Sequence, residues 1–431
     1  MWLPMAMATD LDASVQQALP RLETLYLELH QSPELSYQER QTSQRMAAEL
    51  KQLGFDVTDN VGGYGVVALA RNGDGPVIMI RADMDGLPII EQTGKPYASK
   101  VTTLDANNNT VGVMHGCGHD IHMTSLIGTA AQLMQRKDQW QGTLMIVAQP
   151  AEEVGGGAKA MLNDGLYQTF ALPDAVLGLH VSAAIPAGKV GTISGYALAN
   201  VDSVDIVIKG KGGHGAYPHM TIDPVVLAAR TVLALQTIVS REISPLEPNV
   251  ITVGSIHGGA KHNIISDQVT LQLTLRSYNP EVREQQIAAI KRLVTGIAIS
   301  VGLPESLMPT VVVHQDESIP STYNDPQLAA RVQQSIAAEL GADNLVQAPA
   351  VMAGEDFGLF GRTEQQVPIT LFWLGAVNPQ EYQASIETHQ ALPSLHSSQF
   401  APDYPLTLAT GVRAMTRAAL DAFAAQQPQQ Q

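Results

Sequence analysis

Apolar residues along this chain follow two periodicities that replace each other several times. Between Asp12 and Gly54 they recur at helical spacing, which predicts two helices. Four later runs are continuously apolar, a pattern typical of strands buried on both faces of a largely parallel sheet. These runs are Pro76–Arg81, Thr143–Ala148, Ala175–Val181 and Ile369–Gly375. A further helical pattern over Met123–Gln139 predicts a helix that covers this sheet.

The middle of the chain has a different pattern. Strands are expected over residues 202–210, 249–258, 268–278 and 309–315, and helices over 224–242 and 281–301. This β-α-β-β-α-β order is typical of a small ferredoxin-like domain. Because the first pattern resumes afterwards, we expect an α+β domain at 198–315, inserted into an α/β domain formed by 12–197 and 316–431. The predicted larger domain has a mostly parallel sheet flanked by helices.

Composition and charge exclude several classes of function. The 431 residues include 25 Lys and Arg against 41 Asp and Glu, a net charge of −16. Such a charge repels phosphate backbones and anionic lipids, so we expect no nucleic-acid or membrane partner. The single cysteine fits a reducing compartment, and the first ten residues lack the basic region of a signal peptide. A cytoplasmic location is therefore expected, while removal of a signal peptide would allow a periplasmic or secreted one.

Candidate metal ligands lie in three motifs, of which "QPAEE" and "GLH" come at the ends of buried strands. "HGCGHD" contains Cys117 and His119, "QPAEE" contains Glu152 and Glu153, and "GLH" ends in His180. Thiolate, imidazole and carboxylate all bind zinc and similar ions. Taken alone, the first motif describes a glycine turn with a buried thiol equally well. Because ligands bind beyond the carboxyl ends of strands in open α/β sheets, we expect these groups to meet at one edge.

Three further side chains belong with this edge. Asp83 and Asp85 of "RADMDG" share one face of their strand and are expected to ligate a metal, to orient histidines or to cap a turn. His396 lies in a loop after the last buried run. A Cys–His nucleophile is the alternative chemistry, but it leaves both glutamates without a role.

The inserted domain carries its own candidates. His214 lies among four glycines in "GKGGHGAYPH", where backbone can approach a ligand closely. Asn263 is a candidate amide donor and Arg276 a candidate partner for a carboxylate. A flexible turn and a solvated arginine would explain the same residues.

Eight motifs in order resemble those of the M20 metallopeptidases. They are "RADMDGLPI", "GVMHGCGHDIHM", "QPAEEVGGGAKAM", "GLHV", "GKGGHGAYPH", "IDPV", "GEDF" and a late "LH", and the resemblance runs from about residue 22 to 420. The amidohydrolase branch, with its N-acyl-amino-acid, hippurate and auxin-conjugate hydrolases, is the most similar. Glycine in "HGC" and "NIISD" in place of "NVIPD" depart from its pattern, the second beside Asn263.

The resemblance implies a centre of two divalent metals and a lid domain that often mediates dimerisation. The implied ligands are Cys117, His119, Glu153, His180 and His396. Glu152 would be the general base and His214 would stabilise the oxyanion, in cis or from a partner subunit. Asn263 and Arg276 would grip the substrate carboxylate. Asp83, Asp85 and Asp120, with His115 and His122, would support the ligands. Zinc is favoured by the thiolate, and manganese, cobalt or nickel are alternatives.

The expected activity is hydrolysis of the amide that joins an acyl group to an amino acid, in a homodimer or higher homo-oligomer. A dipeptidase or carboxypeptidase of the same family is the alternative, with a short peptide as substrate. A third hypothesis is a metal-binding scaffold without catalytic activity, and the intact pair Glu152 and Glu153 counts against it.

Overall fold

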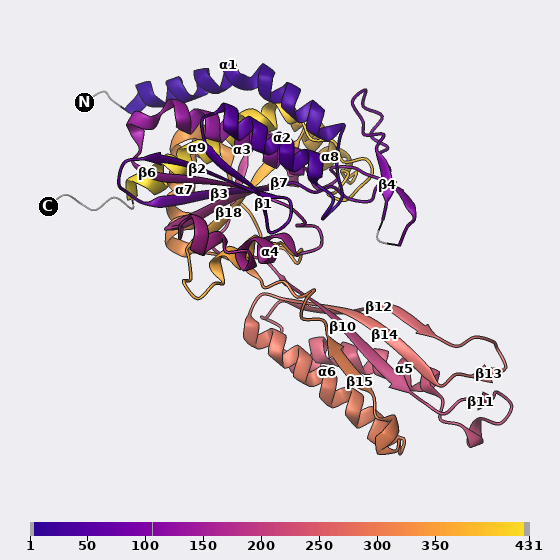
Figure 1. Ribbon diagram of the computed structural model, residues 1–431. Helices are drawn as coiled ribbons and strands as arrows, with labels where there is room; N and C mark the ends of the chain where they lie inside the picture. Colours follow the sequence, from indigo (N-terminus) through magenta and orange to yellow (C-terminus); the bar gives the residue numbers. More distant parts are fainter. Residues whose placement is uncertain (1–3, 106, 426–431) are drawn as a thin grey trace. The chain divides into compact units, whose positions relative to one another are not determined.

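The chain divides into two compact units in the computed structural model, which describes residues 4–105 and 107–425 (Figure 1). The larger unit comprises 1–197, 323–350 and 356–431, and the smaller unit comprises 198–322 and 351–355. The smaller unit extends past residue 315 because Ile319 pairs with Val201 of its first strand, and Leu198 pairs with Val351.

An eight-stranded sheet of order β1-β2-β6-β3-β7-β18-β8-β17 forms the larger unit. Its centre consists of the four predicted runs, which are mutually parallel: β6 (Gly142–Gln149), β3 (Val77–Asp83), β7 (Ala175–Pro186) and β18 (Ile369–Val377). Every residue of β18 is buried, as expected for a strand covered on both faces. The prediction of a mostly parallel α/β sheet is confirmed.

Two strands on each side of this centre were not predicted. β1 (Asp56–Val61) and β2 (Gly65–Asn72) form an antiparallel hairpin beside β6. On the other side β8 (Val190–Thr192) runs antiparallel to β18, and β17 (Leu345–Gln347) pairs with β8. β1 is polar and mostly exposed, so it lacks the apolar run that identified the central strands.

Helices cover both faces of the sheet. α1 (Pro4–His30), α2 (Arg40–Gln52) and α3 (His119–Gln135) lie on one side and α4 (Gly157–Asn163) on the other (Figure 1). α9 (Tyr404–Ala425) packs on α1 and α3, and α7 (Pro326–Leu340) packs on α9; α8 (Pro379–Thr388) follows β18. The predicted helix at 123–139 is shifted: α3 begins at His119, directly after Gly118 with φ 77°. His119 therefore belongs to the first turn of a helix.

The smaller unit has the predicted split β-α-β topology. Its antiparallel sheet has the order β12-β14-β10-β15, and a two-stranded ribbon of β11 and β13 lies beyond one end. The strands are β10 (Asn200–Lys209), β11 (Gly213–His214), β12 (Asn249–Gly258), β13 (Ile264–Ile265), β14 (Gln268–Ser277) and β15 (Thr310–Val313). α5 (Pro224–Thr237) and α6 (Pro280–Ser300) cover one face.

One segment of the described chain, Pro224–Glu242, is long and apolar enough to cross a membrane by length and composition. It contains α5, whose residues Leu227, Ala228 and Leu235 are buried in the core of the smaller unit. A helix that covers a sheet with one face passes the same test, so this segment is weak evidence for a membrane span.

Candidate metal centre and catalytic site

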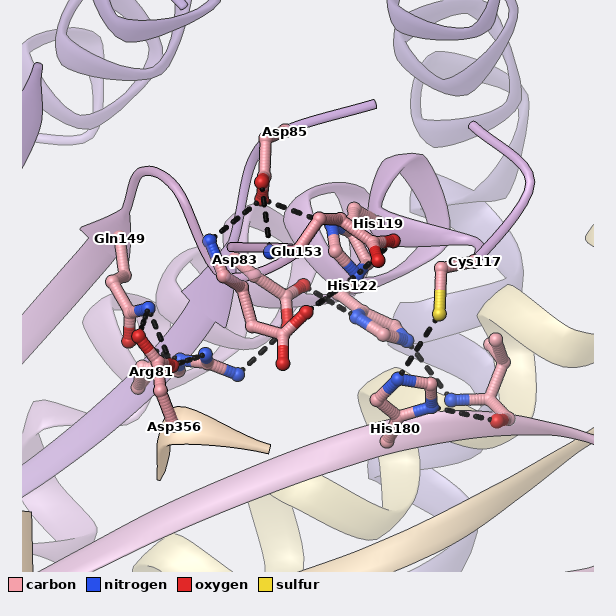
Figure 2. Close-up of polar contacts among 12 residues, drawn as sticks. Arg81, Asp83, Asp85, Cys117, His119, His122, Gln149, Glu153, His180 and Asp356 are labelled. Carbon is pink, nitrogen blue, oxygen red and sulfur yellow. Dashed lines mark hydrogen bonds and ion pairs between the residues drawn. The ribbon is translucent and has the colours of Figure 1, made fainter. Parts of the chain in front are cut away.

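The ends of β3 and β6, and the part of β7 that lies level with them, bring the candidate residues together (Figure 2). Asp83 is the last residue of β3, Gln149 is the last residue of β6, and His180 lies in β7. The turn that contains Glu152 and Glu153 follows β6 directly. The chemistry therefore sits at one edge because parallel strands end at the same edge.

Cys117 lies between two groups of possible ligands. Its Sγ is 3.5 Å from His180 Nε2 and 3.3 Å from His396 Nε2. His396 Nε2 is also 3.4 Å from Glu153 Oε2. Ligand atoms around a tetrahedral zinc ion are separated by about 3.5 Å, given the usual Zn–S and Zn–N bond lengths. The groups Cys117/His119/His180 and Cys117/Glu153/His396 therefore have the spacing of metal ligands.

The hydrogen bonds of His180 define its tautomer. Its Nδ1–H donates to the carbonyl of Val181 over 2.8 Å, so Nε2 keeps its lone pair on the side of Cys117. Burial lowers the pKa of His180 to about 4, and the ring is neutral at pH 7. A neutral ring with its second nitrogen fixed by a backbone carbonyl is the usual form of a metal-bound histidine.

His122 is fully engaged within the protein. Its Nε2 accepts the N–H of Val181 over 2.9 Å, and its Nδ1–H donates to Asp83 Oδ1 over 2.6 Å. Burial lowers the pKa of His122 to about 4. Both nitrogens are occupied, so His122 braces Asp83 and the backbone beside His180, in agreement with a supporting role.

His119 and Glu153 have buried polar atoms without hydrogen-bond partners, which a bound cation would satisfy. Within the described chain, the two ring nitrogens of His119 make no hydrogen bond, and Glu153 Oε1 makes none either. Burial, followed by the charges of Asp85 and Asp83, raises the pKa of Glu153 to about 7. Burial opposes protonation of His119, but Asp83 and Asp85 raise its pKa. A divalent ion would satisfy these atoms and offset the carboxylate charge, so the residues present fit a metal centre.

Asp85 connects His119 to the glutamate turn. Asp85 Oδ1 is 3.4 Å from His119 Nδ1 and accepts the backbone N–H of Glu152 over 3.1 Å. Its Oδ2 accepts the N–H of Glu153 over 3.0 Å and the hydroxyl of Ser36 over 2.6 Å. One carboxylate thus orients a candidate ligand and both glutamates.

A buried arginine supports Asp83 from the opposite side. Arg81 donates to Asp83 Oδ2 over 2.7 Å, to Asp356 Oδ1 over 3.0 Å and to Gln149 Oε1 over 2.8 Å (Figure 2). Gln149 donates to Asp356 in turn, over 2.7 Å. Sequence reasoning did not single out these three residues for a role. The available signal was the position of Arg81, a charged residue at the end of a buried apolar run.

Asp120 and His115 lie near the site without contacting its ligand atoms by hydrogen bonds. The Asp120 carboxylate is 2.6 Å from His30 Nδ1 of α1. Because α3 begins at His119, successive side chains diverge by about 100° around the helix, and Asp120 faces α1. His115 is buried, neither of its ring nitrogens has a partner within the described residues, and burial lowers its pKa to about 4.

The remaining candidates lie in the smaller unit, at two ends of its sheet. β11 and β13 pair His214 with Ile264, next to Asn263, whose carbonyl accepts the N–H of Gly215 over 2.8 Å. His214 is exposed, and its Nδ1 accepts the N–H of Ala216 over 3.0 Å. Arg276 lies near the far end of β14, half-buried and bonded to Thr274. Arg276 is eight positions along the strand from Gln268, a distance of about 26 Å.

Comparison with known proteins identifies the family of this chain. Residues 79–396 match the sequence model of peptidase family M20/M25/M40. The N-acetylcysteine deacetylase of Bacillus subtilis (strain 168) is 36% identical over 364 residues, 84% of this chain and 90% of that protein. Thermostable carboxypeptidase 1 of Saccharolobus solfataricus is 35% identical over 379 residues, 87% of this chain and 88% of that protein.

A solved structure is also similar to this chain. The crystal structure of the YXEP protein of Bacillus subtilis, described as a dinuclear metal binding peptidase from the M20 family, has a TM-score of 0.76 and 30% identity. It covers 95% of this chain and 99% of that chain. With its ordered motifs, its sheet edge and these similarities, the chain belongs to peptidase family M20/M25/M40 and to its amidohydrolase branch, as a metal-dependent hydrolase of amide bonds.

Proposed function

We propose that this chain hydrolyses the amide bond of an N-acyl amino acid with Glu152 as the general base. The observation that carries the proposal is the convergence of ligand atoms beside Glu152, whose Oε2 is 3.9 Å from His119 Nε2. A metal-binding scaffold would not need a second, adjacent glutamate at this point. The relative that is an N-acetylcysteine deacetylase supports an acylated amino acid as substrate.

Five residues would hold two divalent ions, and the two groups that share Cys117 support that number. They are Cys117, His119, Glu153, His180 and His396. When bound, such ions act as Lewis acids that ease deprotonation of water and polarise a carbonyl. The thiol favours zinc, and the nitrogen and carboxylate donors would also accept manganese, cobalt or nickel. Burial and the charge of Glu153 raise the pKa of the Cys117 thiol, so ion binding must be accompanied by loss of its proton.

The residues of the chain then carry the protons. Glu152 takes a proton from the attacking water and delivers one to the leaving amine. Asp85 holds the backbone of Glu152 and Glu153, which fixes the direction of both side chains. In the smaller unit, His214 accepts at Nδ1, so its Nε2–H is available to stabilise the oxyanion. Asn263 and Arg276 are proposed to bind the substrate carboxylate.

The spacing within the smaller unit supports a contribution from two copies. His214 and Asn263 lie beyond the Gln268 end of β14, and Arg276 lies about 26 Å along the strand from Gln268. A substrate the size of an acylated amino acid cannot span that distance. We therefore propose that the His214 and the Arg276 that contact one substrate belong to different subunits.

A homodimer through the smaller unit is the corresponding proposal. β12 is an edge strand of its sheet, and α5 exposes Val226 and Leu233, the latter at 73%. A second copy could pair with this edge and cover the apolar face of α5. Light scattering would give a dimer mass for the wild-type protein and a monomer for Leu233→Glu. A wild-type monomer at working concentration would contradict the proposal.

The alternative substrate class is a dipeptide or a peptide with a free carboxyl terminus, which the carboxypeptidase relative supports. Rates on N-acetyl and N-benzoyl amino acids, measured beside rates on free dipeptides, separate the two classes. We also propose a cytoplasmic location, where the single thiol would stay reduced.

Glu152→Gln tests the proposed mechanism. We expect it to retain its metal content but to lose about 10²-fold or more in kcat, because the amide cannot accept a proton. Glu364→Gln, an exposed residue of the same unit, is the matched control and should keep the wild-type rate. Metal content by mass spectrometry accompanies each rate. A metal-loaded Glu152→Gln variant with near-normal turnover would rule out the mechanism.

A further inference from the structure

The residue before the proposed general base has a strained backbone. Ala151 has φ 50°, in the left-handed region, and it is fully buried. A residue with a Cβ pays about 1–2 kcal/mol for this conformation, so surrounding contacts must hold it. Its geometry determines where the chain turns after β6 and, through that turn, where Glu152 points.

Carboxylates hold three successive backbone N–H groups of this turn. Ala151 N–H donates to Glu39 Oε1 over 2.7 Å, and the N–H groups of Glu152 and Glu153 donate to Asp85. The carbonyl of Ala151 accepts from the N–H groups of Gly156 and Gly157. Asp85 was expected near the site, whereas Glu39 comes from the start of α2, 112 residues before Ala151.

The side chain of Glu39 does not cap its own helix. It occupies the N-cap position of α2 but makes no side-chain cap hydrogen bond there. Glu34 caps the helix instead, because its carboxylate accepts the N–H groups of Gln41 over 3.1 Å and Thr42 over 2.8 Å. Glu39 is nevertheless fully buried, and its Oε2 has no hydrogen-bond partner within the described residues.

Burying this carboxyl group is costly. Burial, followed by the charge of Asp85, raises the pKa of Glu39 to about 7. A buried carboxyl that neither caps its helix nor makes an ion pair is retained where its contact with the partner backbone matters. Its backbone partners are its own N–H, the N–H of Tyr37 two residues earlier and, far away in the sequence, the N–H of the strained Ala151.

We propose that Glu39 is a positioning residue for the general base: its carboxyl group holds Ala151 in the left-handed conformation and thereby aims Glu152 at the attacking water. The inference rests on the proposed role of Glu152. In either protonation state Glu39 keeps an oxygen that can accept the N–H of Ala151, so the brace depends on the acceptor atom rather than on the charge.

Three variants test the brace. Glu39→Ala removes the acceptor and should lower kcat about 10-fold or more, with KM within about twofold and metal content unchanged, because a small misplacement of a catalytic group has effects of this size. Glu39→Gln keeps an acceptor oxygen and should retain most of the rate. Glu39→Ala combined with Ala151→Gly should recover part of the lost kcat, since glycine adopts φ 50° without strain.

The control variant is Glu34→Ala. It removes a helix cap, so it should lower the melting temperature while kcat stays at the wild-type value. If Glu39→Ala does not fold, Glu39→Asp, with its shorter reach, should show the same kcat loss and the same recovery on Ala151→Gly.

The outcomes separate the two proposals. Wild-type kcat in Glu39→Ala, or no recovery in the double variant, would overturn the positioning role while an inactive Glu152→Gln leaves the proposed function standing. A fully active Glu152→Gln would overturn both. A kcat loss in Glu39→Ala that Ala151→Gly partly restores supports the brace, because a purely structural defect would not be relieved by a glycine at that position.

Discussion

A buried histidine at the end of α1 makes the stability of the larger unit depend on pH. His30 is 1% exposed; its Nδ1 is 2.6 Å from Asp120 Oδ2 and its Nε2 is 3.2 Å from Glu91 Oε2. Burial alone would lower its pKa, but the two carboxylates raise it to about 9. Relative to an unfolded value of about 6.5, that shift corresponds to about 3 kcal/mol in favour of the charged, folded form.

The direction follows from proton binding. The folded protein holds a proton on His30 between pH 6.5 and 9, where the unfolded chain does not, so stability falls as the pH rises through this range. The stabilisation is fully present below pH 6.5 and is lost above about pH 9. The wild-type protein should therefore lose about 3 kcal/mol more than His30→Gln between pH 6 and pH 9.5.

Urea unfolding of the chelated, metal-free protein measures this difference. The fluorescence of Trp140 and Trp373 reports on the larger unit, since both lie in its core. His389→Gln, which removes an exposed histidine of the same unit, should follow the wild-type pH curve. Parallel pH curves for wild type and His30→Gln would refute the reasoning.

Three further substitutions have expected outcomes. Cys117→Ser should lose metal and activity together, as measured by metal analysis and by the rate of amide hydrolysis. A variant with full metal content and the wild-type rate would show that Cys117 only packs in the core. Gly118→Ala forces a Cβ into the left-handed region, 2.5 Å from Val181 Cγ2, and should reduce unfolding free energy by about 1–3 kcal/mol in urea titrations. Arg81→Met leaves two buried carboxylates without their cation and should cost about 3–5 kcal/mol by the same assay; a change below 1 kcal/mol would contradict it.

The central sheet could be predicted because its strands are buried on both faces and their sequences are therefore continuously apolar. The same runs identified the edge where Asp83, Glu153 and His180 meet, since parallel strands share an end. β1 was missed because an exposed edge strand needs no apolar run.

Other features depend on backbone conformations that the residue pattern does not record. α3 begins at His119 without a Ser, Thr, Asp or Asn cap, because Gly118 turns the chain with φ 77°. The contact between Glu39 and Ala151 joins residues 112 positions apart through a strained alanine. Neither residue type suggests that partner, so only the folded chain reveals it.

The position of β18 has a consequence for the order in which the chain folds during synthesis. In the sheet, β18 lies between β7 and β8. In the sequence, the whole sheet of the smaller unit, residues 200–313, comes after β7 and β8 and before β18. The smaller unit can therefore form while the ribosome is still translating, with the apolar edge of β7 left without its neighbour. Such an edge invites pairing with other chains, so the nascent larger unit should be the species that chaperones protect until about residue 377 has emerged.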